Sequence, residues 1–411
     1  MFLLPSLLSL TLSQGRGSAE VHPKISYKVC TKAGCTTKNG GIVIDSEWRD
    51  IVTADGAPCL KSNGDFDIPN VCKDAADCSD KCLLNGYTYS KASVSTSGSA
   101  VRLGFLNSDG SIGSRVYLFD EDLKQYQLWK MVNKEITFDI DTSTLGCGTN
   151  GALYFSEMDA DGGSSRFPRN KAGAAYGTGY CDAQCPRDGK FIGNNANVGR
   201  KYGSCCFEWD VWEANAYATQ MAAHPCGVNT PAYVCESDCQ KCDTSGCANN
   251  PYRFEAQNGV KNHPFYGLGK QVDTSKKFTV VTQFISSNGL DSGTLKEVRR
   301  LYVVGGKVVE TVAKIQNGKP YNTIGNDFCT NGSAGDDAYM RLGGDAAFTK
   351  SFQRGAVLAI SLWTDGSMGW LDEIDGGPCT SPGGKEGVIA KNKNSYVEYS
   401  NIRYGDIDTT Y

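Results

Sequence analysis

Histidine, net charge and long apolar runs are all scarce in this sequence, and each shortage excludes a class of protein. The 411 residues include three histidines, at positions 22, 224 and 263, and no nucleophile-elbow pattern, so a triad of serine, histidine and aspartate has few candidates. The formal net charge of −4 argues against nucleic acid as the main partner and offers no attraction to an acidic membrane surface. Beyond the first residues, no apolar run approaches the ~20 residues that a membrane span requires. We therefore expect neither a nucleic-acid partner nor a membrane partner.

Helical periodicity, repeats and linkers are scarce as well. Residues 74–84 form the one short stretch that favours a helix. No segment rich in proline, serine and threonine divides the chain, and Tyr411 follows soon after the last strand pattern. We expect a single domain over residues 20–411.

Strand patterns make up most of the chain. They alternate apolar and polar residues or combine β-branched with aromatic residues, and they cover residues 135–141, 277–285, 301–309, 355–363 and 396–404. The third is expected to form a hairpin, because Gly305-Gly306 is a two-residue turn that tolerates positive φ. With 48 glycines for turns and 40% hydrophobic residues for a core, the sequence predicts an all-β fold, a single large sandwich.

The first twenty residues, MFLLPSLLSLTLSQGRGSAE, have most features of a secretory signal. The apolar run from Phe2 to Leu12 has the length of a signal core, and Gly17-Ser18-Ala19 offers small residues for cleavage. The positive charge that usually precedes such a run is missing, and a buried N-terminal segment is the alternative. We expect a signal peptide at residues 1–19 and a soluble, secreted protein.

Cysteine, in contrast, is abundant. The eighteen cysteines are an even number, which favours disulfides in an oxidising compartment. The spacing of Cys235, Cys239, Cys242 and Cys247 would also suit zinc. The signal-like start and the adjacent pair at 205 and 206 favour disulfides over zinc, and they leave no cysteine as a nucleophile.

One strand-like stretch, CCFEWDVWEANA from Cys205 to Ala216, places three carboxylates among large apolar side chains. On a regular strand Glu208, Asp210 and Trp212 share one face. Glu213 points to the other face unless a bulge or the end of the strand redirects it. An ordinary amphipathic strand with its acids in solvent explains the stretch equally well.

Two carboxylates across a cleft are what glycoside hydrolysis requires. One, ionised, attacks the anomeric carbon, and the other, protonated, gives its proton to the leaving oxygen. Retaining enzymes hold the pair about 5–5.5 Å apart, whereas five residues of flat strand span roughly 16 Å, so the backbone must bend if Glu208 and Glu213 act together. Asp210 would hydrogen-bond Glu208 and help to hold the pair in different protonation states. His224, anchored beside Cys226, is a candidate for the same cleft, with a plain structural histidine as the alternative.

A second acidic stretch, Glu157 to Gly163, suggests calcium. With Glu157 as the first ligand, the twelfth position of an EF-hand loop falls on Pro168, which has no carboxylate. We interpret the stretch as a turn, and we expect no metal and no cofactor.

Together these motifs resemble the family 7 glycoside hydrolases, cellulases built on a large concave β-jelly roll. The family signature is Glu-x-Asp-x-x-Glu after two adjacent cysteines, which matches Cys205 to Glu213. Further matching blocks follow the family's order and are Gly151–Met158, Gly177–Cys185, His224–Cys226, Asn250–Arg253, Ser361–Trp363, Gly369–Asp372 and Ser400–Arg403. The resemblance implies a single disulfide-rich β-jelly-roll sandwich of two curved antiparallel sheets with a concave substrate cleft. It also implies that the partners are cellulose or other β-1,4-glucan chains. Because no linker divides the sequence, we expect no carbohydrate-binding module, and we expect a monomer.

The resemblance implies roles for individual residues. Glu208 matches the nucleophile, Glu213 the acid/base, Asp210 the residue that hydrogen-bonds the nucleophile, and His224 a histidine near the leaving group. Aromatic rings offer rigid apolar surface to the faces of glucose rings. The implied sugar contacts are Trp48, Arg115, Asn150, Tyr154, Asp182, Gln184, Trp363 and Trp370.

Other positions follow the family in their structural role. Trp129 and Trp212 are assigned to the core. The cysteines would form nine bridges, with Cys181–Cys206 and Cys185–Cys205 pinning the strand that carries the carboxylates. Phe207, Trp209 and Ala223 depart from the residues common beside the site, which bears on rate and pH optimum more than on mechanism. The sequon Asn331-Gly-Ser333 is expected to be exposed and to carry a glycan.

Within the family, the chain is more similar to the endoglucanases than to the chain-end cellobiohydrolases. Cys226 and Cys242 enclose fifteen residues without the tunnel branch's insertion, and Asp50 stands where tunnel enzymes have an entrance tryptophan. Ser156-Glu157 has the endoglucanase form, whereas Cys185–Ile192 is more similar to the cellobiohydrolases. We expect hydrolysis of internal β-1,4-glucosidic bonds with retention. The alternatives are a chain-end cellobiohydrolase and, more remotely, a lectin-like glucan binder, which would need no trio of acids.

Overall fold

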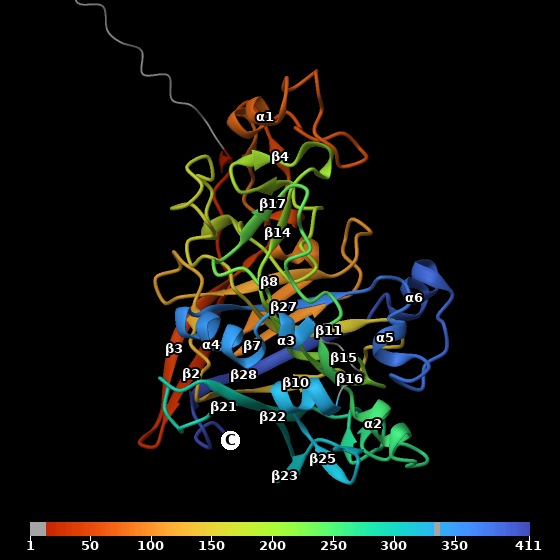
Figure 1. The fold of residues 1–411 in the computed structure, drawn as a ribbon. Coiled ribbons are helices and arrows are strands. Elements are labelled where there is room, and N and C mark those ends of the chain that lie inside the picture. The colour runs from red at the N-terminus through yellow and green to blue at the C-terminus, as the bar shows by residue number, and fades with distance from the viewer. Residues whose placement is uncertain (1–13, 333–337) are drawn as a thin grey trace, which may run out of the picture.

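The computed structural model describes residues 14–332 and 338–411, in which one long succession of paired strands folds over on itself. Strand β3 (Gly34–Ile44) is the strand at which the succession passes from one layer to the other. The first part of β3 pairs with β2 (Lys24–Thr31), and its last four residues pair with β8 (Ser114–Phe119). The two halves of the succession therefore form two layers joined by continuous backbone hydrogen bonds (Figure 1).

The layer that carries the acidic motif is termed the front sheet. Its strands pair in the order β18 (Cys247–Asn249), β16 (Thr219–His224), β15 (Glu208–Ala214), β11 (Asn150–Ser156), β27 (Ala356–Trp363), β8 and β3, with β9 (Leu128–Trp129) beside β27. These pairings are antiparallel, as expected for a jelly roll.

The other layer is termed the back sheet. Its strands are β2, β28 (Tyr396–Asp406), β10 (Lys134–Asp141), β21 (Phe278–Ser286) and β22 (Leu295–Val304), followed by β23 (Lys307–Glu310) and β26 (Thr323–Ile324), while β7 (Ala100–Gly104) and β6 (Val94–Ser97) lie along the first half of β28. Only the β2–β28 pair among these is parallel.

The main core lies between the two sheets and follows the period of two along each strand. On β11, Leu153 and Phe155 join this core, while Tyr154 belongs to a smaller cluster on the other face of the front sheet. Ile136 and Phe138 of β10 reach the core from the back sheet. Burial on both faces explains why β27 is apolar almost throughout.

The strands and the hairpin predicted from the sequence are confirmed. Gly305 and Gly306 join β22 to β23 with φ of 58° and 76°, the left-handed turn that glycine favours. Short additional strands are β1 (Gly15–Arg16), β4 (Ile51–Val52), β5 (Leu83–Leu84), β12 (Phe191–Ile192), β13 (Asn195–Ala196), β14 (Gly203–Cys205), β17 (Tyr233–Cys235), β19 (Tyr266–Gly267), β20 (Val272–Asp273), β24 (Lys314–Gln316) and β25 (Lys319–Tyr321).

Helices are more numerous than the sequence predicted. The expected helix at 74–84 is α1, capped by the Asp74 side chain, and it ends before β5. Its bounds and those of the unpredicted helices are α1 (Ala75–Lys81), α2 (Pro251–Gln257), α3 (Ala338–Arg341), α4 (Gly344–Arg354), α5 (Gly369–Asp372) and α6 (Gly384–Asn392). In α4, Phe348 and Phe352 lie one turn apart, a helical spacing, and both contact Trp209. No described helix has the length and apolarity to cross a membrane.

All eighteen cysteines lie in the described part of the chain and form nine disulfides. The disulfide interpretation is thereby confirmed over zinc. Cys181–Cys206 and Cys185–Cys205 are paired as the resemblance implied. The turn interpretation of the second acidic stretch also holds, since Glu157 binds Ser351 and Arg354 of α4.

The N-terminal segment enters the fold earlier than expected. Gln14 is buried, and β1 pairs with β5 in a small sheet. The Tyr176 hydroxyl donates to the Ser18 carbonyl at 2.8 Å. Residues 1–13, which hold most of the expected signal peptide, lie outside the described residues. The domain boundary at residue 20 stays a prediction, and the contacts of residues 14–19 favour an earlier start.

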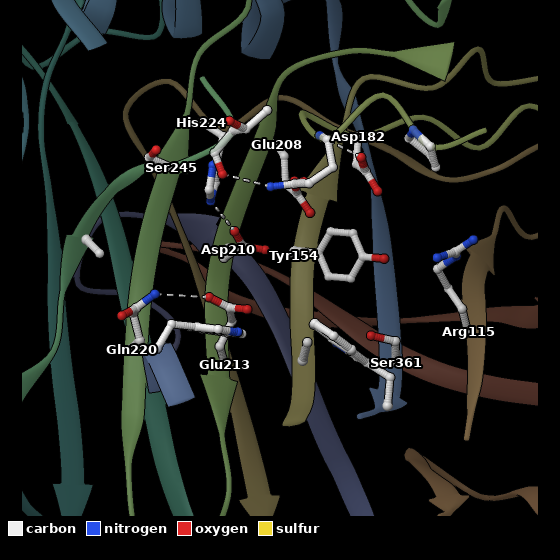
Figure 2. A pocket seen from close by; sticks show the side chains of 18 of the residues that line it. Arg115, Tyr154, Asp182, Glu208, Asp210, Glu213, Gln220, His224, Ser245 and Ser361 are labelled. Carbon is white, nitrogen blue, oxygen red and sulfur yellow. Dashed lines mark hydrogen bonds and ion pairs between the residues drawn. The ribbon is translucent and has the colours of Figure 1, made fainter. Parts of the chain in front are cut away.

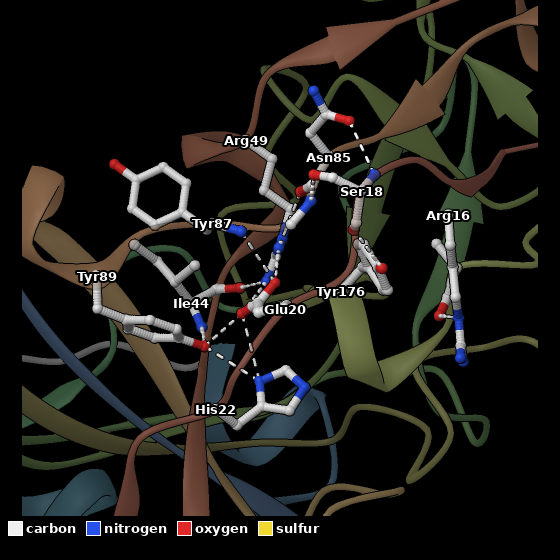
Figure 3. Close-up of polar contacts among 12 residues, drawn as sticks. Arg16, Ser18, Glu20, His22, Ile44, Arg49, Asn85, Tyr87, Tyr89 and Tyr176 are labelled. Carbon is white, nitrogen blue, oxygen red and sulfur yellow. Dashed lines mark hydrogen bonds and ion pairs between the residues drawn. The ribbon is translucent and has the colours of Figure 1, made fainter. Parts of the chain in front are cut away.

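Glu20 anchors this segment through a buried network (Figure 3). Arg49 Nη2 and the Tyr89 hydroxyl donate to Glu20 Oε1 at 3.1 and 2.6 Å, and His22 Nδ1 lies 3.3 Å from the same oxygen. Burial alone would raise the pKa of Glu20, but His22, Arg49 and Tyr89 outweigh burial and lower the pKa to about 2.

Replacing Glu20 by glutamine is expected to make stability depend less on pH. Because the folded-state pKa of Glu20 lies below its ordinary value of 4.5, its stabilisation is complete above pH 4.5 and is lost as the pH falls toward 2. The variant should lose on the order of 3 kcal/mol at pH 7 and little at pH 2. Chemical denaturation at both pH values measures this, with the exposed Glu121→Gln as control. An equal loss at both would contradict the network's role.

Candidate active site

A cleft of about 810 Å³ lies on the outer face of the front sheet. Figure 2 shows its floor: Glu208, Asp210 and Glu213 project from β15, Gln220 and His224 from the neighbouring β16, and Tyr154 and Ser361 from the strands on the other side. Both groups of strands are antiparallel neighbours in the same sheet. The acidic motif therefore faces a cleft, and the solvent-exposed alternative is excluded.

A β-bulge at Val211 brings the three carboxylates onto one face. In the β11 ladder Asp210 pairs with Tyr154 and Trp212 with Leu153, so Val211 is an extra residue. The β16 ladder is interrupted at the same point, between Asp210 and Glu213. One inserted residue reverses the alternation of side chains. A bulge, rather than the end of the strand, therefore brings Glu213 onto the face of Glu208 and Asp210.

The same bulge turns Trp212 inward, to the face that Trp209 already occupies. Trp209 and Trp212 are fully buried in the main core, as predicted for Trp212. Phe207 packs edge-on against Phe348 and Phe352 of α4. The large side chains around the acids therefore support the strand from behind.

His224 and Asp210 form an ion pair beside Glu208. His224 Nε2 lies 3.0 Å from Asp210 Oδ2, and Nδ1 lies 2.9 Å from the Asp243 carbonyl oxygen. Both neighbours are acceptors, so the doubly protonated imidazolium satisfies both. Burial would lower the pKa of His224, but Asp210, with a smaller contribution from Glu208, outweighs burial and raises the pKa to about 10.

Gly246 fixes the position of that imidazole. Its φ is +73°, and a Cβ atom there would lie 2.3 Å from His224 Cε1. The loop that holds Gly246 is itself ordered by Asp243, whose side chain accepts from the Gly246 amide at 3.0 Å. Glycine is required at this position by backbone conformation and by close approach.

Glu213 is held by two amide side chains. Asn150 Nδ2 donates to its Oε1 at 3.0 Å, and Gln220 Nε2 approaches its Oε2 at 3.5 Å. Burial, reinforced by the charge of Asp210, raises the pKa of Glu213 to about 8 despite these donors and His224. Glu213 is therefore protonated at neutral pH, as a proton donor must be.

Glu208 lies between His224 and the loop at Asp182. The Ala183 amide donates to Glu208 Oε2 at 3.3 Å, and His224 pairs with Glu208 across the ladder. Burial and the charges of Asp210 and Asp182 raise the pKa of Glu208 well above its ordinary value, while His224 opposes them. Asp210 thus acts on Glu208 through its charge, whereas the expected hydrogen bond between them is replaced by the pair with His224.

A polar cluster around Arg115 lines part of the cleft. Arg115 donates to Asp45 at 2.8 Å and stacks on Tyr180, whose hydroxyl donates to Asp182 at 2.7 Å. Trp48 also lines the cleft, with its indole N–H bound to the Gly113 carbonyl. These groups place rigid donors, acceptors and one aromatic face along the cleft.

Two further tryptophans line the cleft. Trp363 and Trp370 stack with ring centroids 6.3 Å apart, and each is 37% exposed. Their open faces suit apolar faces of sugar rings. Gln184 also lines the cleft, and its side chain donates to the Thr244 carbonyl at 3.2 Å.

The structure brings together the expected site residues with one change and several additions. Asn150 is fully buried, is not part of the cleft lining, and contacts Glu213 rather than the cleft. Residues that the sequence analysis missed are Tyr180, Gln220, Gly246, Arg253 and Ser361. Gln220 could have been found, because it lies two and four residues before Ala222 and His224 on the same face of a strand.

Several groups of described side chains have the spacing to hold a metal ion. Glu208, Asp210 and His224 offer ligand atoms within 4.8 Å of one another, but the imidazole nitrogen that would bind a metal is directed at Asp210. The cysteine groups with suitable spacing are all oxidised to disulfides. The acids of the cleft are therefore best interpreted as a proton-transfer cluster.

Comparison with known proteins yields a consistent set of matches. A sequence profile described as "Glycosyl hydrolase family 7" matches residues 14–411. A cellobiohydrolase of that family from Daphnia pulex is 33% identical, with a TM-score of 0.89, covering 97% of this chain and 100% of its own. The endocellulase EGI of Humicola insolens is 37% identical, with a TM-score of 0.86 and coverage of 97% and 100%. A Melanocarpus albomyces cellobiohydrolase, solved with cellotetraose, is 35% identical, with a TM-score of 0.85 and coverage of 97% and 99%.

His224 is expected to remain an imidazolium through neutral pH, with a pKa of about 10. In Asp210→Asn, burial should dominate and move the pKa of His224 below its ordinary value of 6.5. NMR titration of the three histidine rings measures both values, and His224→Asn assigns the signal. A His224 ring that titrates near 6.5 in the unaltered protein would contradict the proposed charge state.

Proposed function

The chain belongs to glycosyl hydrolase family 7, and from this premise we propose that it cuts internal β-1,4-glucosidic bonds of cellulose and related β-glucans, with Glu208 as nucleophile and Glu213 as acid/base. Retaining hydrolysis of β-1,4-glucans is the chemistry of this family. The observation that carries the assignment is the bulge at Val211, which places both carboxylates on the floor of one cleft.

The proposed reaction has two steps. Glu208, as carboxylate, bonds to the anomeric carbon while the glycosidic C–O bond breaks and Glu213 gives its proton to the leaving oxygen. Water then attacks the anomeric carbon, Glu213 takes a proton from it, and the bond to Glu208 breaks. Two inversions at one carbon give net retention.

The electrostatic arrangement supports Glu213 as the proton donor. Glu213 is protonated at neutral pH because its pKa is raised to about 8. The imidazolium of His224 and the Ala183 amide favour the ionised form of Glu208, while burial and the charges of Asp210 and Asp182 raise its pKa overall. Positive charge that develops on the sugar ring in the transition state adds to this stabilisation.

Glu208→Gln should lower kcat on cellotetraose by at least ~10⁴-fold, because the change removes the nucleophile at nearly constant shape. Glu213→Gln should lower kcat/KM for cellotetraose by ~10²–10⁴-fold but affect 2,4-dinitrophenyl β-cellobioside far less, because that leaving group needs no proton. Steady-state kinetics with both substrates measure this.

The matched control is Glu398→Gln, on the back sheet, where Glu398 pairs with Arg102 and Lys277. Its activity should equal that of the unaltered protein. Near-normal turnover of cellotetraose by Glu208→Gln would overturn the assignment of the nucleophile.

The shape of the cleft supports internal cutting. Trp363 and Trp370 are each 37% exposed, so both rings remain accessible from solvent. Cys226–Cys242 closes a short loop, with Cys235–Cys239 inside it, close to the cleft residue Gly246. An uncovered cleft admits the middle of a chain and releases it quickly after a cut.

A chain-end cellobiohydrolase is the second candidate. Pro186 and Asp188, in the stretch that resembles the cellobiohydrolases, line the cleft near Trp48. The similar solved structures include enzymes of both kinds at 33–38% identity.

The two modes are distinguished by the viscosity of carboxymethyl cellulose plotted against reducing ends released. Internal cutting should lower viscosity early, after few bonds are broken, because each cut shortens long chains. A slow fall in viscosity with cellobiose as nearly the sole product would favour the cellobiohydrolase instead.

Export of the protein is part of the proposal. Nine disulfides suit an oxidising compartment, and most of the expected signal, residues 1–13, lies outside the described residues. Asn331 is exposed, as a glycan acceptor must be, while Ser333 of its sequon lies outside the described residues.

A further inference from the structure

Arg300 is a buried charge directly behind the acidic motif. It belongs to β22 of the back sheet, is 2% exposed, and spans the core to reach the front sheet. Its Nη2 donates to the carbonyl oxygen of Val211, and its Nε donates to Thr282 Oγ1 at 3.1 Å. The guanidinium lies 5.3 Å from the ring centre of Trp212.

This guanidinium has no carboxylate within ion-pair distance among residues 14–332 and 338–411. Burying a charge without an opposite charge is costly, so such residues are retained where their hydrogen bonds matter. Burial lowers the pKa of Arg300, but an arginine side chain still carries its charge in proteins. One of its acceptors is the backbone carbonyl of Val211.

Val211 is the extra residue of the bulge. A bulge interrupts the ladder and leaves backbone groups that need another partner. Inside a dry core, a carbonyl without a donor is unfavourable, whereas a charged donor satisfies it strongly. Arg300 therefore stabilises the bulged backbone relative to a regular strand, which would return Glu213 to the core face.

We propose that Arg300 is a positioning residue, which locks the bulge at Val211 and thereby holds Glu213 on the cleft face opposite Glu208. The proposal rests on the catalytic roles proposed above. It assigns part of the catalytic geometry to a residue that touches neither substrate nor the carboxylates.

Arginine suits this task better than lysine. Its planar fork reaches the Val211 carbonyl and the Thr282 hydroxyl together and lies against the Trp212 ring. A lysine could bond one acceptor at a time and would be harder to keep charged in the core. Arg300→Lys is therefore expected to rescue only part of the function.

The test is the substrate dependence of Arg300→Met. Glu208 precedes the bulge and keeps its ladder partners Ser156 and His224, so the displaced group should be Glu213. We expect kcat/KM for cellotetraose to fall ~10²-fold, as for a misplaced catalytic group. For 2,4-dinitrophenyl β-cellobioside, kcat/KM should fall less than about fivefold, and azide, which needs no base, should raise its turnover.

The matched control is Arg299→Met, one residue away, where the side chain is half-exposed and pairs with Glu297. It should leave both substrates unaffected. If Arg300→Met fails to fold, Thr282→Val supplies the test, since it removes the hydroxyl bound by Arg300 Nε at nearly constant shape. The same selectivity is then expected at about three- to tenfold, the scale of one lost hydrogen bond.

Glu213→Gln, assayed in parallel, separates the two proposals. If it lacks the substrate selectivity, the assignment of Glu213 fails. If Glu213→Gln shows the selectivity but Arg300→Met lowers both substrates equally, or neither, the positioning role of Arg300 fails and Glu213 stands.

Discussion

The chemistry of this protein depends on one bulged residue in one strand. If Val211 were paired as in a regular strand, the alternation along β15 would turn Glu213 toward the core, and Glu208 would lose Glu213 as its partner across the cleft. The bulge therefore creates the catalytic arrangement within an otherwise regular sheet. The residues packed around the bulge stabilise this locally unfavourable backbone.

Covalent bonds reinforce that backbone on both sides. Cys181–Cys206 and Cys185–Cys205 tie the segment just before Glu208 to the loop that carries Asp182. Cys226–Cys242 ties the segment just after His224 to the loop of Gly246. Behind the strand, α4 presses Phe348 and Phe352 against Trp209. Carboxyls with raised pKa values need such a rigid, dry frame, because water or movement would relax their charges.

The sequence predicted those features that depend on local pattern. The strands followed from alternation and β-branching, and the face of Glu213 could be predicted only conditionally, since a bulge is a property of two neighbouring ladders. Helix α4 was missed because its apolar stripe is short, with polar residues around Phe348 and Phe352. The pairing of Asp210 with His224 and the contact of Asn150 with Glu213 join segments that are separate in the sequence. The spacing of residues along the sequence therefore could not predict these contacts. Arg300 had no motif at all, since its role exists only where the two sheets face each other.

The place of β28 in the fold has a consequence for biosynthesis. This strand, residues 396–406, lies inside the back sheet, with β10 on one side and β7 and β2 on the other. Strands β2, β7 and β10 thus have to wait for residues 396–406, which are made much later, before their sheet can close. Cys147–Cys379 imposes the same order through a separation of 232 residues. Until residues 396–406 have been made, the back sheet stays open, and its unpaired strand edges are exposed to association with other chains.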